Sequence, residues 1–161
     1  MEMTKPRLYL ETSVWNFIFA DDAPEKKQIT LAFFNKVKNG EYEIFISDTV
    51  IQEIERADED KKRQLFESIE HYKPKVLEIN DDVGRMSREY ISEGVIPQTK
   101  LDDATHAAVA TVHRLDALIS WNLKHLANYN KMERINEVNI RNGYSKRLEL
   151  ITPMEVSDAE I

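Results

Sequence analysis

The sequence has 161 residues, of which 42% are hydrophobic and 32% charged, with a formal net charge of −7 and no cysteine. This length fits one domain, since domains usually contain about 100–200 residues, and the absence of cysteine excludes disulfides, thiolate zinc sites and cysteine nucleophiles. The acidic balance argues against tight nonspecific binding of nucleic acid, which depends on Lys and Arg side chains that neutralise phosphates. We therefore expect residues 1–161 to form a single domain.

The chain has no segment that predicts a membrane or secretory location. No stretch approaches the roughly 18 apolar residues of a membrane span, and no long apolar run follows a basic start at the N-terminus. We expect a soluble, cytoplasmic protein with no membrane partner. Basic residues gather at 61–63, at Lys73 with Lys75, and at 141–147, and the simplest interpretation is a solvated surface.

The first half of the chain alternates strand-like and helical patterns. Residues 7–11 predict a strand, followed by a turn or short helix over 13–20. Apolar residues recur at a helical period within 25–40, and Gly40 marks the end of that helix. A buried strand is predicted at 42–47, with Asp48 and Thr49 as plausible caps of the next helix. A further helix is predicted over 61–72.

The second half continues the alternation. We expect a short strand at 75–79, a helix from Asn80 or Asp81 to Gly94, and a connecting loop over 95–101. A helix then begins near Asp102, a strand covers 117–120, a loop follows, and a last strand lies within 147–153. Strands that alternate with helices predict an α/β fold with a parallel sheet covered on both faces and joined by right-handed crossovers.

Acidic and amide side chains fall where strands end or helices begin. Glu11 closes the first strand, Glu53 lies early in the helix after the second, and Asp102 and Asp103 open the helix before the strand that Asn122 follows. The carboxyl ends of parallel strands share one edge, so these segments can converge. A carboxylate cluster repels itself unless it holds a cation or its pKa values rise. Oxygen-rich sites suit Mg²⁺ or Mn²⁺, which promote phosphodiester cleavage.

Each of these residues also has an ordinary structural explanation. Acids in the first turn of a helix interact favourably with its dipole. For Asp102 and Asp103 this structural explanation is as good as a functional one. Glu53 alone reads as a solvated helix residue, and Asn122 as a turn or cap residue. Glu11 is harder to explain in this way, because acids are depleted in strands.

Two histidines and a tryptophan accompany these acids. His106 lies one turn after Asp103, so a His-carboxylate metal site is conceivable, but a surface position is the simpler expectation for His106 and for His113. Trp121 is expected in the core, although at the rim of a site it would be able to stack on a base.

Four segments in this order resemble the PIN domain, a ribonuclease fold known from toxins of type II toxin–antitoxin modules: "LYLETSVWN", "FISDTVIQEIER", "LDDATHAAVATVHRLDALISWNLKHLAN" and "LITPMEV". The resemblance extends from Leu8 to about Val156, and the third segment is similar to the branch with a "WN..H" motif. It implies a three-layer α/β/α sandwich with a central, mostly parallel sheet of four or five strands and an acidic pocket for Mg²⁺ or Mn²⁺.

The resemblance also assigns residues to this site. Glu11, Glu53 and Asp103 match the first three acidic positions and would be the metal ligands, while Asn122 falls at the fourth and completes the catalytic set. Thr12 or Ser13 matches the small hydroxyl residue after the first acid, and these two residues with Asp102 would support the site, Asp102 by adding charge. The list of expected catalytic residues is Glu11, Glu53, Asp103 and Asn122.

Two positions depart from the usual pattern. Glu11 is one methylene longer than the usual Asp, and Asn122 is uncharged where many members have Asp, which should weaken a second metal site more than a first. The leading hypothesis is a metal-dependent endoribonuclease that acts on RNA, is blocked by an antitoxin protein if it is a toxin, and forms the homodimer common in the family. The alternative is a noncatalytic PIN-like binding module. A receiver domain or a nucleotide-binding fold fits poorly, because the paired acids come late and no Gly-rich phosphate loop is present.

Overall fold

The structure is a computed structural model that describes residues 4–156. Five strands form one sheet, namely β1 (Arg7–Leu10), β2 (Glu43–Ser47), β3 (Lys75–Leu77), β4 (Ala117–Ile119) and β5 (Glu149–Ile151). Every neighbouring pair is parallel, and the strand order is β3-β2-β1-β4-β5. The predicted parallel α/β sheet is confirmed. Among residues 4–156, no helix is long and apolar enough to cross a membrane.

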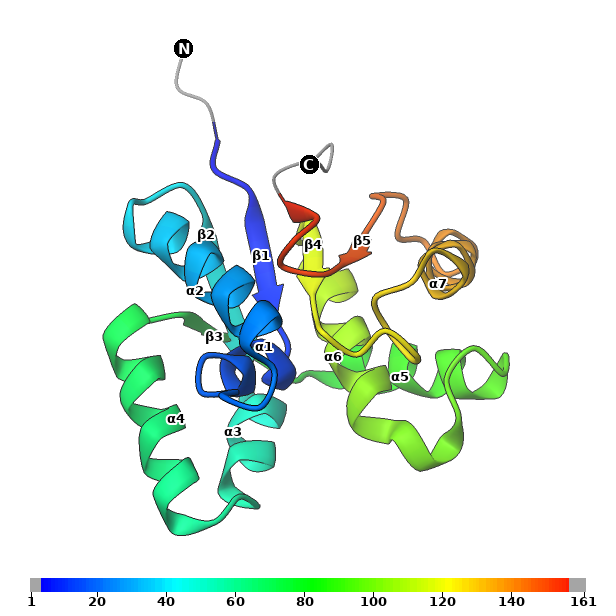
Figure 1. The fold of residues 1–161 in the computed structure, drawn as a ribbon. Helices are drawn as coiled ribbons and strands as arrows, with labels where there is room; N and C mark the ends of the chain where they lie inside the picture. Colours follow the sequence, from blue (N-terminus) through cyan, green and yellow to red (C-terminus); the bar gives the residue numbers. More distant parts are fainter. Residues whose placement is uncertain (1–3, 157–161) are drawn as a thin grey trace.

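The helices form two groups around this sheet: α1 (Thr12–Phe17), α2 (Pro24–Lys38), α3 (Asp48–Glu55) and α4 (Glu59–Tyr72), then α5 (Asp81–Ser92), α6 (Leu101–Val112) and α7 (Tyr129–Arg141). Contacts within each group dominate, with α1 to α4 packed together and α5 packed on α6 and α7. Figure 1 shows the groups on opposite sides of the strands, which gives the three-layer α/β/α sandwich.

The strand order explains this division. From β1 the chain moves to β2 and β3 in one direction, and from β3 it returns past β1 to β4 and β5. Right-handed crossovers in opposite directions place their helices on opposite faces. The direction reverses between β1 and β4, and in open α/β sheets this point, at the carboxyl ends of the strands, is where ligands bind.

The three inner strands β1, β2 and β4 are buried on both faces, as their sequences require, whereas the edge strand β3 is largely exposed. The central strand β1 contributes Leu8, Tyr9 and Leu10, all with 0% exposure, and β4 is equally buried. Continuous apolar runs of this kind are typical of parallel strands. Trp121 packs in the core as expected, and its indole N–H donates to Thr30 Oγ1 at 2.9 Å.

Three local predictions need correction. The cap of α3 is Ser47, whose hydroxyl accepts from the Thr49 N–H at 3.3 Å, rather than Asp48 or Thr49. The expected loop at 95–101 contains a 3₁₀ turn, η1 (Gln98–Lys100). The 13-residue helix α7 occupies a segment that we expected to be a loop.

The sequence of α7 explains why its pattern is weak. Its mixture of Asn, Lys, Glu and Arg hides the apolar residues Ile135 and Val138. Two of its asparagines are buried because they have specific partners: the Asn136 side chain donates to Leu148 O and accepts from Leu148 N, each at 2.8 Å, and Asn139 hydrogen-bonds the Tyr90 hydroxyl. These bonds replace the apolar contacts that the helical period normally reveals.

Candidate metal centre at the carboxyl edge of the sheet

The carboxyl edge between β1 and β4 carries a hollow of about 410 Å³. Its lining includes carboxylates from three elements: Glu11 directly after β1, Glu53 on α3, and Asp102 and Asp103 in the first turn of α6, with Ser13 and Asn122 beside them. The chain therefore brings together residues that are more than 100 positions apart in sequence.

Glu11 is held by two hydroxyl groups, one after β1 and one after β4, the two strands between which the strand order reverses. Ser13 Oγ donates to Glu11 Oε1 at 2.5 Å, and Ser120 Oγ donates to the same oxygen at 2.7 Å. Both hydroxyls accept backbone N–H groups in return, from Trp121 at 2.8 Å and from Asn122 at 2.9 Å. This closed arrangement fixes the longer Glu side chain, and Ser120 is a site residue that the sequence analysis did not identify.

Glu53 is held by Thr12 and by a histidine. Thr12 Oγ1 donates to Glu53 Oε1 at 2.8 Å, and His106 Nε2 lies 2.5 Å from the same oxygen. Burial raises the pKa of Glu53, but the hydrogen bonds and the charge of His106 outweigh burial and hold that pKa below its ordinary value. Thr12 therefore acts on a carboxylate, and Glu53 is more than a solvated helix acid.

The expectation of a surface position for His106 was wrong. Its side chain is fully buried on the sheet-facing side of α6, where Nδ1 lies 2.6 Å from the Tyr9 hydroxyl. Tyr9 in turn bonds Ser47 Oγ at 2.8 Å. Burial lowers the pKa of His106, while the bond to Glu53 and the charges of Glu11 and its neighbours raise it, and the balance lies above the ordinary value.

The direction of this buried chain depends on the charge of His106, because both ring nitrogens donate in the charged form and only one donates in the neutral form. A carboxylate only accepts, so the proton between His106 and Glu53 belongs to His106 Nε2. In neutral imidazole Nδ1 then accepts from the Tyr9 hydroxyl, whose oxygen accepts from Ser47, whose oxygen caps α3. The chain from Ser47 to Glu53 thus ties both the start of α3 and the Glu53 side chain to the central strand β1.

Asn122 is oriented by the backbone that follows it. Its Oδ1 accepts from the His125 N–H at 3.1 Å, which places its amide nitrogen toward Asp103, where it donates to Oδ2 at 3.2 Å. Since an N–H only donates, the alternative amide orientation would put two donors face to face. The side-chain oxygen of Asn122 is therefore bonded to the backbone, and its amide nitrogen contacts the site through Asp103.

Asp103 and Asp102 have different surroundings although they are adjacent. Asp103 is 8% exposed, and burial together with the nearby Glu11 carboxylate raises its pKa to about 6. Asp102 reaches the other way and pairs with Arg56 at 2.8 Å. The structure thus places Asp103 among the site carboxylates and directs the charge of Asp102 largely to an arginine.

The metal-free protein is expected to lose stability as the pH rises from about 4 to about 6. The folded pKa of Asp103 lies above its unfolded value, so the native state binds more protons in this window and stability falls with pH. Two pKa units are about 3 kcal/mol, and solvent screening reduces this to about 2 kcal/mol. His106, whose pKa is raised above 6.5, continues the decline at higher pH, whereas the lowered pKa of Glu53 gives a contribution that is lost only as the pH falls below about 4.5.

Denaturant unfolding in EDTA, repeated at saturating Mn²⁺, measures this slope. The free energy of unfolding should decline across the window in EDTA and be flatter with the ion. A free energy that increases with pH in EDTA would contradict this reading of the cluster.

The parallel five-stranded sheet and the carboxylate hollow at its reversal point define an α/β protein with an acidic site of the kind that binds hard cations. The sequence matches the PIN domain family over residues 8–130, and the chain belongs to this family. The resemblance to the PIN domain family is thereby confirmed. A search of curated protein sequences finds no match.

Two solved structures are similar in fold. A chain of VapBC2 from Rickettsia felis, solved bound to a DNA fragment from their promoter, has a TM-score of 0.54 and 17% identity, covering 91% of this chain and 96% of that chain. A chain of FitAcB from Neisseria gonorrhoeae has a TM-score of 0.51 and 14% identity, covering 92% and 99%. At these identities the similarity concerns the fold.

Proposed function

We propose that this protein is a metal-dependent endoribonuclease and that it acts as the toxin of a type II toxin–antitoxin module. The observation that carries the proposal is the convergence of Glu11, Glu53 and Asp103 in one hollow at the reversal point of the sheet. Membership of the PIN domain family and the fold similarity to VapBC2 and FitAcB support it.

The donor set suits Mg²⁺ or Mn²⁺. Ligand atoms of Glu11, Glu53 and His106 lie within 4.8 Å of one another, but His106 Nε2 is committed to Glu53. Among the described residues, the second oxygens of Glu11, Glu53 and Asp103 accept no hydrogen bond. The free oxygens of Glu11 and Glu53 would hold the ion, and Asp103, which lies outside the group of ligand atoms within 4.8 Å, would reach it directly or through a water. When bound, the ion stabilises charge on the phosphodiester and lowers the pKa of a bound water.

The chain's own groups prepare this donor set. Ser13 and Ser120 hold one oxygen of Glu11, Thr12 and His106 hold one oxygen of Glu53, and Asn122 holds one oxygen of Asp103. Each carboxylate therefore has one anchored and one available oxygen. Partners that fix ligand orientation in this way typically contribute 10–100-fold to metal affinity or activity. We assign Glu53 the additional role of orienting or deprotonating the attacking water.

Incubation of the purified protein with labelled single-stranded RNA and Mg²⁺, Mn²⁺ or EDTA tests the proposal. Cleavage is expected with either ion and not with EDTA, and it should be lost in Asp103→Asn. A folded protein that cuts no RNA under any of these conditions would overturn the nuclease assignment, and cleavage that persists in EDTA would overturn the metal dependence.

The uncharged Asn122 favours one second candidate, a noncatalytic PIN-like binding module. Three carboxylates rather than four would face the ion, and the amide of Asn122 already donates a hydrogen bond to Asp103. In this alternative, wild-type protein binds RNA or a protein without cutting RNA.

Asn122→Asp distinguishes the two candidates. The new carboxylate can still accept from the His125 N–H, but its second oxygen faces Asp103 and adds charge to the site. We expect at least about tenfold tighter Mn²⁺ binding by calorimetry and lower stability in EDTA. Cleavage by both wild type and Asn122→Asp supports the nuclease, whereas cleavage by the variant alone supports the noncatalytic module.

Two protein partners belong to the same proposal. An antitoxin would bind over the acidic hollow, and the chain would form a homodimer, as the family resemblance implies. Light scattering of the purified protein measures whether the homodimer forms. A monomer at working concentration would exclude the homodimer.

A further inference from the structure

A group of cationic side chains borders the acidic hollow on its α7 side. We name Lys100, Lys124, Lys131 and Arg134 the cationic strip, and His125 lies among them. Lys100 ends η1 and lines the hollow itself, Lys124 and His125 lie in the β4–α7 connection directly after Asn122, and Lys131 and Arg134 are one turn apart on α7. The strip therefore begins at the site and continues away from it.

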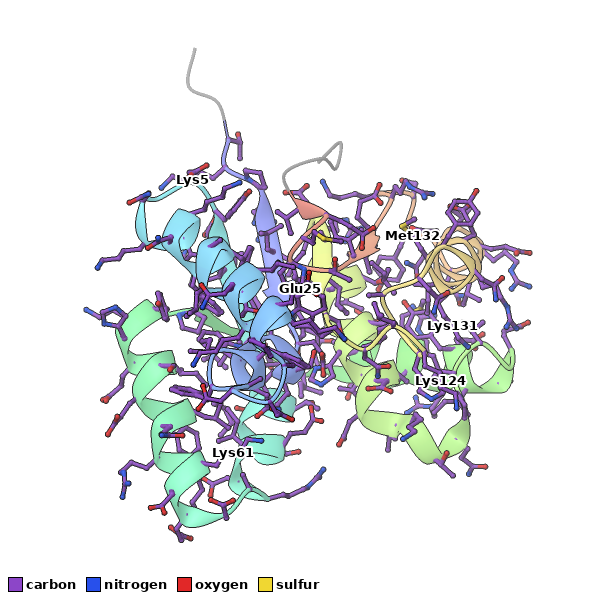
Figure 2. The ribbon with its side chains drawn as sticks, in the orientation of Figure 1. Lys5, Glu25, Lys61, Lys124, Lys131 and Met132 are labelled. Atoms are coloured by element: carbon purple, nitrogen blue, oxygen red, sulfur yellow. The ribbon has the colours of Figure 1, made fainter. Side chains whose placement is uncertain are left out.

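The contacts of the strip bring its members together. Lys131 Nζ donates to Val95 O, and Arg134 Nη2 donates to Gly94 O at 3.2 Å, which holds both cations against the segment that leads to Lys100. Burial together with the charges of Lys124, Lys100 and Lys131 lowers the pKa of His125. Three positive charges thus act on one imidazole. Figure 2 shows Lys124 and Lys131 at the same end of the molecule.

Most of the basic residues that cluster in the sequence are neutralised by acids. Lys62, Arg63 and Lys75 pair with nearby acids, and so do Arg141, Lys146 and Arg147. Within residues 4–156, no member of the cationic strip forms an ion pair with an acid. In a chain of net charge −7, this leaves the strip as a concentration of uncompensated positive charge beside the hollow.

The position of the strip fits a polyanion better than a small ligand. A carboxylate-lined hollow repels phosphates, so a nucleic acid needs nearby cations to approach it. Apolar surface lies beside these cations, with Leu123 in the same connection at 48% exposure and Tyr129, the first residue of α7, at 73%. Exposed aromatic rings beside cations are typical of single-strand binding, in which bases stack while phosphates contact Lys and Arg.

We propose that the cationic strip binds the backbone of single-stranded RNA and directs it into the acidic hollow, with Tyr129 available for stacking. The inference rests on the proposed nuclease function and adds the face over which the substrate approaches. Lys100 joins the two, because it belongs to the strip and lies at the hollow.

Fluorescence anisotropy of a labelled single-stranded RNA, measured in EDTA at several KCl concentrations, tests the proposal without cleavage. The variant is Lys100→Gln with Lys124→Gln, both exposed. The matched control is Lys5→Gln with Lys38→Gln, which removes the same charge from exposed positions near the amino edge of the sheet. Figure 2 shows Lys5 at the end of the molecule away from Lys124.

The strip variant is expected to bind RNA about 25-fold more weakly at about 0.1 M salt and to reduce the slope of log K against log salt by about 1.4, because each lysine contributes about 0.7 on single strands. The control should stay within about twofold of wild type. Equal weakening in both variants, or none in the strip variant, would overturn the strip while leaving the nuclease proposal intact.

Absence of RNA binding by wild-type protein at low salt would overturn the strip and also remove RNA as the substrate. Absence of cleavage with metal, in a protein whose strip variant loses RNA binding, would overturn the nuclease alone. The two proposals therefore fail in distinguishable ways.

Discussion

Replacement of Asp103 by asparagine is expected to abolish metal-dependent cleavage and also to raise the free energy of unfolding in EDTA by about 1–2 kcal/mol. Asp103 is buried beside Glu11, and its pKa of about 6 shows that the metal-free fold disfavours its charge. Removing the charge recovers about 2 kcal/mol after solvent screening, less up to about 1 kcal/mol for a lost acid at a helix N-terminus. The two effects together are characteristic of a residue retained for function at a cost in stability.

The loss of cleavage activity in Asp103→Asn should be at least about 100-fold, the range seen when a group that stabilises the transition state is removed. Asp102→Asn is the matched control: it makes the same chemical change one residue away, at a side chain that is 36% exposed and paired with Arg56. We expect a stability change below about 1 kcal/mol and a much smaller loss of cleavage. Greater loss of cleavage in Asp102→Asn than in Asp103→Asn would show that Asp102, and not Asp103, is the aspartate of the site.

His106→Ala is expected to have the largest effect on stability, on the order of 3–4 kcal/mol. The substitution opens a cavity at a fully buried position and removes one hydrogen-bond partner from Tyr9 and one from Glu53, which keep only Ser47 and Thr12. Denaturant unfolding measures the loss. Mn²⁺ affinity should fall about 10–100-fold, because Glu53 is no longer oriented.

Two further variants distinguish the role of His106 in orienting Glu53 from its role in filling space in the core. His106→Gln can place an amide N–H near the position of Nε2, so it should recover part of the Mn²⁺ affinity that His106→Ala loses. Tyr9→Phe keeps the ring and removes only the hydroxyl, and its effect should be non-additive with that of His106→Gln. Mn²⁺ affinity equal to wild type in all three variants would show that the buried chain from Ser47 to Glu53 has no role in the site.

The fold was largely predictable because its strands are short, apolar and separated by helical segments. Leu8 to Leu10 and Ile44 to Ile46 are buried on both faces, so their sequences carry a simple signal. The α7 helix lacked that signal because Asn136 and Asn139 fill core positions through hydrogen bonds to partners distant in sequence. A propensity argument has no access to such partners.

The site was predictable in its charges and less so in its supporting groups. Glu11, Glu53 and Asp103 were assigned to the site by the PIN resemblance, since their places at strand ends and helix starts left ordinary explanations open, and the structure brings them to one hollow. His106 was missed as a buried residue because its burial depends on Tyr9 and Glu53, which lie 97 and 53 residues away. The spacing Asp103 to His106, one helical turn, is the available signal, and it does not reveal which face is buried.

The cationic strip shows the same limit for surface charge. Clusters visible in the sequence, such as Lys62 with Arg63, are paired with acids on neighbouring turns. Lys100 and Lys131 are separated by 31 positions and share a neighbour in His125 only after folding. Where charge gathers therefore depends on the topology, which places the η1 turn and the β4–α7 connection at one edge.

Titration of the metal-free protein with Mn²⁺, followed by calorimetry for wild type and Asp103→Asn, tests the central claim most directly, namely that Glu11, Glu53 and Asp103 share a divalent ion. The account predicts one saturable site in the wild-type protein and at least about tenfold weaker binding in the variant. Undetectable Mn²⁺ binding by the folded wild type, or equal binding by both proteins, would contradict it.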